Sequence, residues 1–172
     1  QFKLPGNRKK KLLGALSEFP TGTMAVGRLD EDSEGLLLLT TDGKLSHHIC
    51  SSGIEKEYYV EVDGEIDDEA IVQLRRGVEI GLQGERYKTQ TCEVEILPPL
   101  LDLPIEHRKN RDQKHGTTSW LSITLSEGKY RQVRKMTAAV GHPTLRLIRV
   151  RVGNTLLEIE PGIVIETGNF DL

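Results

Sequence analysis

Residues 56–62 set the strongest limit on the fold, because apolar and polar side chains alternate there. Tyr58, Val60 and Val62 would share one face of a strand, with Glu57, Tyr59 and Glu61 on the other. Successive side chains of a strand point to opposite faces of its sheet. The pattern therefore predicts a strand with one face against the core and one face in water.

Other segments extend this sheet and cover it. Strands are also predicted over residues 24–28, 36–41, 91–96, 119–125 and 145–152, with a last strand pair beginning at 156–159. Helices are predicted over residues 8–18, 44–49, 69–76 and 130–140, and loops over 30–35 and 100–117, with Gly35 as a turn residue. Strands outnumber helices, so we expect one α+β domain over residues 1–172, with a central, mainly antiparallel mixed sheet flanked by helices and loops.

Composition narrows the class of protein. Hydrophobic residues make up 37% and charged residues 28%, as in an ordinary globular protein. The longest apolar block, residues 36–39, is far too short to cross a membrane. The cysteines, Cys50 and Cys92, are too few for a disulfide framework, and the adjacent His47 and His48 have no partner motif for a metal. We therefore expect a cytoplasmic protein that has no metal site and does not insert into a membrane.

Charge is distributed unevenly along the chain, although the net charge is only −3. Residues 107–151 hold 11 basic and 2 acidic side chains, whereas residues 12–106 hold 7 basic and 20 acidic ones. A concentrated basic segment beside an acidic body is typical of a protein with one surface that faces phosphate. The alternative is a solvated charged face that binds nothing in particular.

The loop of residues 27–35 concentrates four carboxylates. Its glycine spacing and its strand neighbours do not fit a calcium-binding loop, which lies between helices. A glycosidase that uses two separated acids stays possible from these residues alone, as does a solvated acidic turn. Within the loop, we expect Glu31, Asp32 and Glu34 to be solvated or capping groups.

The second cluster of charge is basic and covers residues 127–136. On a helix over 130–140, Arg131, Arg134 and Lys135 would share one side, because their spacings are three and four residues. Guanidinium groups near a helix N-terminus suit phosphate or carboxylate recognition. A basic amphipathic surface helix without a ligand is the alternative.

These residues resemble a known family. Gly27-Arg28-Leu29-Asp30, continued by residues 32–43, is similar to the catalytic motif of pseudouridine synthases of the small-subunit ribosomal type. Lys56-x-Tyr58-x-Val60 resembles the family's second motif, and residues 127–136 with Leu147-x-Arg149 resemble its third. The three motifs also occur in the family's order.

The resemblance implies an isomerase that needs no cofactor and assigns roles to three residues. It implies that Asp30 is catalytic, that Tyr58 stacks on the target base, and that Arg134 pairs with the catalytic carboxylate. We further expect Arg131 and Lys135 to bind RNA phosphate, together with the loop of residues 107–115. Arg28 would either clamp a phosphate or brace its own loop.

The resemblance also suggests the substrate and the extent of the domain. The subgroup without an N-terminal RNA-binding domain of the S4 type is the most similar, which implies a specific uridine in large-subunit ribosomal RNA as the target. A small-subunit target and a catalytically silent RNA-binding relative remain as alternatives. We expect a monomer whose catalytic domain lacks the family's first strand.

Overall fold

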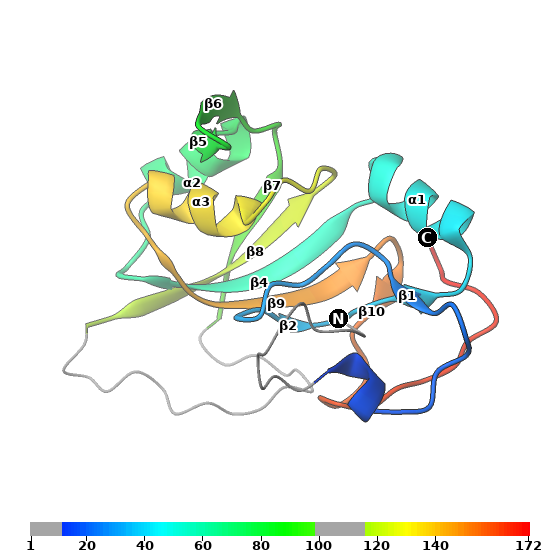
Figure 1. Cartoon of the computed structure of the whole chain (residues 1–172). Coiled ribbons are helices and arrows are strands. Elements are labelled where there is room, and N and C mark those ends of the chain that lie inside the picture. Colours follow the sequence, from blue (N-terminus) through cyan, green and yellow to red (C-terminus); the bar gives the residue numbers. More distant parts are fainter. Residues whose placement is uncertain (1–11, 99–115) are drawn as a thin grey trace.

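A six-stranded sheet forms the centre of the computed structural model, which describes residues 12–98 and 116–172 (Figure 1). Its strands follow the order β10-β9-β4-β8-β7, and β2 pairs with β9 off this path. The bounds are β2 Glu34–Gly35, β4 Lys56–Asp63, β7 Glu93–Leu97, β8 Thr118–Leu125, β9 Thr144–Val152 and β10 Thr155–Leu156. Among the described strands of this sheet, only β2 and β9 pair in parallel, so the predicted mixed and mainly antiparallel sheet is confirmed.

Strand β4 lies between β8 and β9 and pairs with β8 along its whole length. Val60 and Val62 are fully buried, as their place in the alternating pattern predicts. Glu57 and Glu61 on the other face accept hydrogen bonds from Ser122 and Thr118 of β8. The alternation of residues 56–62 therefore predicted both the strand and the face that enters the core.

In the described part of the chain, three α-helices accompany the sheet: α1 Gly43–Ser51, α2 Asp68–Arg76 and α3 Gln132–Ala139. Aspartate side chains cap the first two, because Asp42 accepts from the backbone of α1 and Asp67 from that of α2. Figure 1 shows α2 and α3 over one face of the sheet, with α1 beyond the end of β4. Among the described helices, none is long and apolar enough to cross a membrane.

Buried apolar side chains form two separate clusters. The larger one joins β4, β7 and β8 to α2 and α3, and Leu74, Leu121 and Met136 lie at its centre with no exposed surface. The smaller one contains Val26, Leu36, Leu38, Ile49 and Val152 and packs α1 against the segment that precedes it. Within the described residues, two apolar cores therefore meet the same sheet, the smaller one through Val152.

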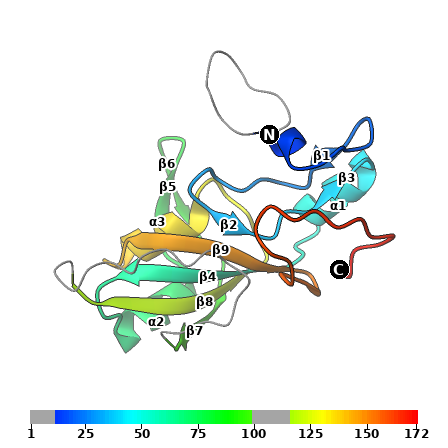
Figure 2. The same ribbon diagram turned by 90° about the horizontal axis from the view of Figure 1, so that it is seen from below.

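Two small sheets complete the fold. β1 (Met24–Ala25) pairs with β3 (Leu39–Thr40), and β5 (Glu79–Leu82) pairs with β6 (Glu85–Lys88). The turn of the second pair contains Gln83 and Gly84, both at positive φ, which is the geometry that suits the twist of a two-residue hairpin. The sequence had not indicated this hairpin, and Figure 2 shows it beyond α3, well clear of β9.

Several predicted elements are shorter than expected. Where a helix was predicted over 8–18, the structure has only the 3₁₀ turn η1 (Leu13–Ala15), which buries no residue; residues 8–11 lie outside the described part. The strands predicted over 24–28 and 36–41 reduce to β1 and β3, and β10 ends at Leu156. Most of the predicted loop over 100–117 also lies outside the described residues.

Candidate active site

The acidic loop of residues 27–35 is fixed to the sheet at its C-terminal end. Glu34 and Gly35 lie beside Ile148 and Arg149 of β9, and the backbone N–H of Leu36 donates to Arg149 O at 2.8 Å. Gly35 was predicted to serve a turn, but it is a strand residue with φ of 98°. A Cβ there would lie 2.3 Å from the carbonyl oxygen of Arg149, so only glycine permits this approach.

A buried ion pair strengthens the same attachment. Arg146 donates from Nε and Nη2 to the two carboxylate oxygens of Glu34, at 2.9 and 2.8 Å. The two side chains are only 11% and 19% exposed. The expectation that Glu34 is a solvated group was therefore wrong, because its carboxylate holds β2 against β9.

Asp30 lies at the other end of this loop, opposite α3. Its carboxylate is 23% exposed and forms an ion pair with Arg131, whose Nη1 lies 3.6 Å from Oδ2. Its backbone carbonyl accepts from the N–H of Ser33 at 2.9 Å, which closes a turn. Asp30 is thus a partly exposed carboxylate that is held beside one guanidinium group.

Arg131 holds two carboxylates of the loop at once. Its guanidinium donates to both oxygens of Asp32, at 3.0 and 2.9 Å, while it also faces Asp30. The hydrogen bond from Arg131 lowers the pKa of Asp32 below its usual value, and the same bond raises the pKa of Arg131. Asp32, expected to be solvated or capping, is instead the residue that anchors Arg131.

The backbone conformation of Arg131 directs its side chain toward Asp30 and Asp32. The residue is the N-cap of α3 and has φ of 52° and ψ of 38°, in the left-handed region that non-glycine residues rarely adopt. Such conformations cluster at functional sites, where the surrounding contacts maintain them. Here, the two hydrogen bonds from Arg131 to Asp32 help to maintain the left-handed backbone conformation.

Arg134 contacts the acidic loop at Asp32 and Ser33 and does not pair directly with Asp30 in the described residues. Its Nη2 donates to the backbone carbonyl of Asp32 at 2.6 Å and lies 3.4 Å from the Ser33 hydroxyl. Burial lowers the pKa of Arg134, whose side chain is 11% exposed. The predicted Asp30–Arg134 pair is therefore replaced: within the described residues, the ion pair of Asp30 is with Arg131.

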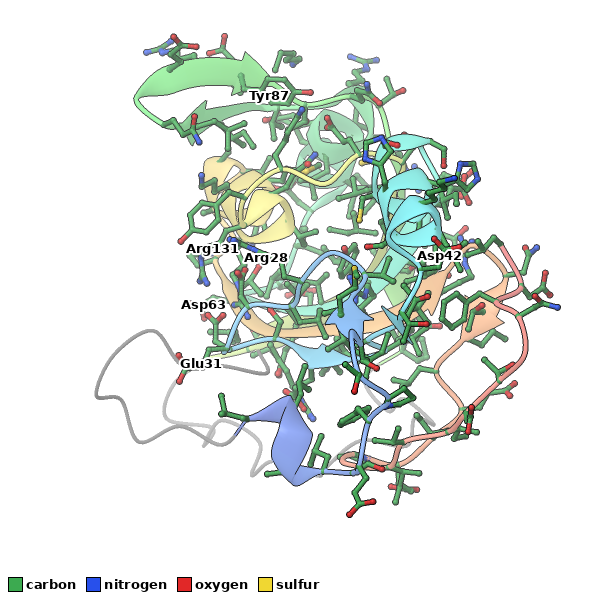
Figure 3. All side chains as sticks on the ribbon, turned by 45° about the vertical axis from the view of Figure 1, so that its right-hand side comes forward. Arg28, Glu31, Asp42, Asp63, Tyr87 and Arg131 are labelled. Atoms are coloured by element: carbon green, nitrogen blue, oxygen red, sulfur yellow. The ribbon has the colours of Figure 1, made fainter. Side chains whose placement is uncertain are left out.

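Two further cations meet at Tyr130, a residue for which no role was predicted. The guanidinium carbon of Arg28 and the Nζ of Lys135 lie 5.4 and 5.1 Å from the centre of its ring. Tyr130 is 58% exposed, and Figure 3 shows Arg28 close to Arg131 at this end of α3. Lys135 also donates to the carbonyl of Gly81 at 2.7 Å. This surface offers positive charge together with an aromatic ring.

Tyr58 lies on the sheet itself. It stands opposite Ile123 of β8 and Arg149 of β9, is partly buried and packs against the larger core. Arg149 is 5% exposed and donates from Nε to the carbonyl of Leu36 at 2.8 Å. Leu36 directly follows the acidic loop. Tyr58 and the end of that loop therefore both lie beside Arg149 of β9.

Glu127 organises the turn that leads to Arg131, although the sequence had not marked it individually. Its carboxylate accepts from the hydroxyl of Tyr87, from the backbone of Gln90 and from the amide of Gln132. Gln132 in turn accepts from the backbone of Lys129 at 2.9 Å. The β5–β6 hairpin and the start of α3 are therefore joined through one carboxylate.

Other features contribute less to a site. A hollow of about 350 Å³, lined by residues that include Arg76, Glu79 and Lys88, lies beside the hairpin and not among the Asp30 contacts. In the described part of the chain, no group of three or more potential metal ligands occurs. The chemistry of this molecule is best sought around Asp30.

The comparison with family models decides the classification. The model described as RNA pseudouridylate synthase matches residues 5–139. The chain belongs to that family. The matched stretch contains the acidic loop, Tyr58 and all of α3, so this pseudouridylate synthase domain carries its candidate site within the family's own region.

Named relatives support the same classification. A Xanthomonas axonopodis pv. citri protein named ribosomal large subunit pseudouridine synthase E is 42% identical over 147 residues, which are 83% of this chain and 75% of that protein. A Yersinia pestis protein named ribosomal large subunit pseudouridine synthase B is 39% identical over 133 residues, or 76% and 36% of the two chains. A crystal structure of a pseudouridylate synthase superposes with a TM-score of 0.70 and 30% identity, covering 88% of this chain and 59% of that one.

Proposed function

We propose that this chain converts a specific uridine of large-subunit ribosomal RNA into pseudouridine, with Asp30 as its catalytic residue. The observation that carries the proposal is the partly exposed Asp30 carboxylate, held beside Arg131 in a domain of this family. The large-subunit target rests on the named relatives from Xanthomonas and Yersinia.

The proposed reaction is an isomerisation of the nucleotide. The C1′–N1 bond breaks with its electron pair on the uracil, the base turns, and a bond forms between C1′ and C5. The proton of C5 is lost, and N1 gains one. Atoms and electrons balance without a donor, a cofactor or a metal, so we propose that the protein uses none of them.

Asp30 would act on the nucleotide as an anion. The guanidinium of Arg131 is already fixed by Asp32, so it needs no rearrangement to orient the Asp30 carboxylate. A preorganised charge of this kind is more effective than one that must first be recruited. We propose that Asp32 and Arg134 serve as positioning residues for this pair.

The target base must leave the RNA stack before Asp30 can reach it, at a cost of a few kcal/mol. We propose that Tyr58 stacks on the extruded base, and that Arg28, Tyr130 and Lys135 contact the RNA around it. Arg131 faces two carboxylates, so we propose that its main role is to orient Asp30 and that it adds little to phosphate binding. The protein would act as a monomer in the cytoplasm.

The test is to map pseudouridines in ribosomal RNA from cells with and without this protein, and with the Asp30→Asn variant. Loss of one large-subunit site in both altered strains is expected, because asparagine keeps the shape of Asp30 but not its charge. Glu31→Gln is the matched control, since Glu31 is exposed and Figure 3 shows it apart from Arg131. An Asp30→Asn strain that retains the modification would contradict the catalytic role.

Asp30→Asn also separates an enzyme from a silent RNA-binding relative. The purified variant should bind the target RNA as tightly as the wild type and convert none of it. A wild-type chain that binds but converts nothing would favour the silent relative. Lys135→Ala should weaken binding and make its salt dependence shallower, because one phosphate contact is lost.

A further inference from the structure

A polar seam separates the two apolar cores on the face of the sheet that carries Tyr58. The larger core includes the β8 side chains opposite β4, and the smaller one includes Val152 of β9. Between them lie Lys56 and Tyr58, which are two residues apart on β4 and therefore point to one face. Arg149 is the β9 partner of Tyr58, so three polar side chains share this strip.

Arg149 is buried but not fully paired. It is 5% exposed, and its Nε donates to the carbonyl of Leu36 at 2.8 Å. Its two Nη groups have no hydrogen-bond or ion-pair partner among the described residues, yet neither is sealed from solvent. The Arg149 side chain is therefore mostly buried, but its Nη–H groups remain available to donate hydrogen bonds to a ligand.

Lys56 brings a second cation to the same strip. Its Nζ donates to the backbone carbonyl of Ile54 at 2.6 Å, and it forms no ion pair with a carboxylate in the described residues. Burial lowers the pKa of Lys56, and repulsion from Arg149 adds to this while Cys50 opposes it. Buried charges are normally paired. Two neighbouring cations without a carboxylate therefore point to an acceptor that arrives with the ligand.

The depth of the strip indicates which part of the RNA reaches it. In an extruded nucleotide the base enters furthest, whereas the phosphates stay with the strand at the surface, near exposed groups such as Tyr130. Tyr58, the proposed stacking partner of the base, is the direct cross-strand neighbour of Arg149. Uracil presents two carbonyl oxygens, and Arg149 and Lys56 present only donors.

We propose that Arg149 and Lys56 bind the carbonyl oxygens of the extruded uracil and hold the base after it detaches from C1′. This inference rests on the proposed function and assigns the base-binding residues of the same site. When the C1′–N1 bond breaks, the uracil carries the electron pair, and its charge spreads onto the two carbonyl oxygens. The cations stabilise this anion until C5 bonds to C1′ and N1 takes up a proton. The interaction is stronger after bond cleavage than before it, so it accelerates the reaction.

The test compares three RNA substrates with the wild type, Arg149→Lys and Lys56→Gln. The substrates are the target hairpin with uridine, 2-thiouridine or 4-thiouridine at the modified position, since sulfur accepts hydrogen bonds weakly. Single-turnover rates at saturating protein report the chemical step, and filter binding reports affinity. Arg76→Gln, an exposed position on α2, controls for the loss of a positive charge alone.

Both site variants should slow the single-turnover step about 10- to 100-fold, the loss expected for a hydrogen bond to a charged group. Affinity for the RNA should stay within about threefold of the wild type. The penalty for one of the two thio-substrates should shrink in Arg149→Lys, because the contact that sulfur weakens is already altered. Arg76→Gln should behave as the wild type does on all three substrates.

Three results would overturn the inference. Equal losses on every substrate together with a lower melting temperature would mean that Arg149 only braces Leu36. A loss confined to affinity, with a shallower salt dependence, would mean that the strip binds phosphate. Wild-type rates in both variants would mean that neither side chain touches the base. By contrast, a wild-type chain that converts no uridine would refute the proposed function itself and the inference with it.

Discussion

Replacing Gly35 by alanine should detach the catalytic loop from the sheet. Gly35 has φ of 98°, and an added Cβ would lie 2.3 Å from the carbonyl oxygen and 2.8 Å from the nitrogen of Arg149. Both contacts are with backbone atoms of β9, which cannot rotate away as a side chain can. The only relief is for β2 to move off β9, and this movement would displace Asp30, five residues earlier in the loop.

Two terms give the size of the effect. An alanine at positive φ costs about 1–2 kcal/mol relative to glycine. Separating β2 from β9 adds at least the hydrogen bond from Leu36 N to Arg149 O, worth about 1 kcal/mol. We therefore expect a loss of at least about 2–3 kcal/mol in the free energy of unfolding. A displacement of about 1 Å at Asp30 should also reduce kcat about 100-fold.

Urea unfolding followed by the fluorescence of Trp120, the single tryptophan, measures the first quantity, and pseudouridine formation measures the second. Gly84→Ala is a matched control, because Gly84 has φ of 90° and no atom within 4 Å of an added Cβ. Gly84→Ala therefore has the cost of an alanine at positive φ but no clash with a neighbouring strand, and it should retain full activity. If both variants lose the same stability and activity, the close approach to Arg149 is not what fixes the loop.

Three further predictions test other contacts. Asp32→Asn should lower stability at neutral pH by no more than about 1 kcal/mol, because the pair is partly exposed. Since Arg131 lowers the pKa of Asp32 below the ordinary value of 3.8, this difference should persist at neutral pH and shrink as acidification protonates first the unfolded and then the native wild-type carboxylate, as urea unfolding at each pH would show. Glu127→Gln should reduce kcat about tenfold while the RNA dissociation constant holds, because an amide cannot accept from three donors equally; an unchanged kcat would refute this role. Iodoacetamide at pH 8 should label the exposed Cys50 before Cys92, whose pKa burial raises to about 11, as mass spectrometry would reveal.

Local patterns predicted the elements whose residues interact with near neighbours in sequence. The alternation around Val60 indicates β4 because a strand has a period of two residues. Asp67 and Gly77 mark the two ends of α2 because a helix end needs an acceptor for its first N–H groups and a residue free to turn the chain. In these cases, the information lies within the segment itself.

The parts that sequence did not predict depend on distant contacts. β2 has only two residues and exists because β9 lies beside it, so Gly35 looked like a turn residue. Spacing identified Arg131 and Arg134 as neighbours but could not tell which one faces Asp30. That choice depends on the left-handed backbone of Arg131. Glu34 likewise looked solvated because Arg146 is 112 residues away along the chain.

The attachment of β2 to β9 also has a consequence for biosynthesis. The strand that holds the Asp30 loop is synthesised more than a hundred residues after the loop itself. Contacts so distant along the chain close slowly, after more local structure has formed. A growing polypeptide that has not yet emerged from the ribosome through β9 therefore lacks an assembled catalytic loop. Activity should begin only after β9 has emerged and has paired with β2.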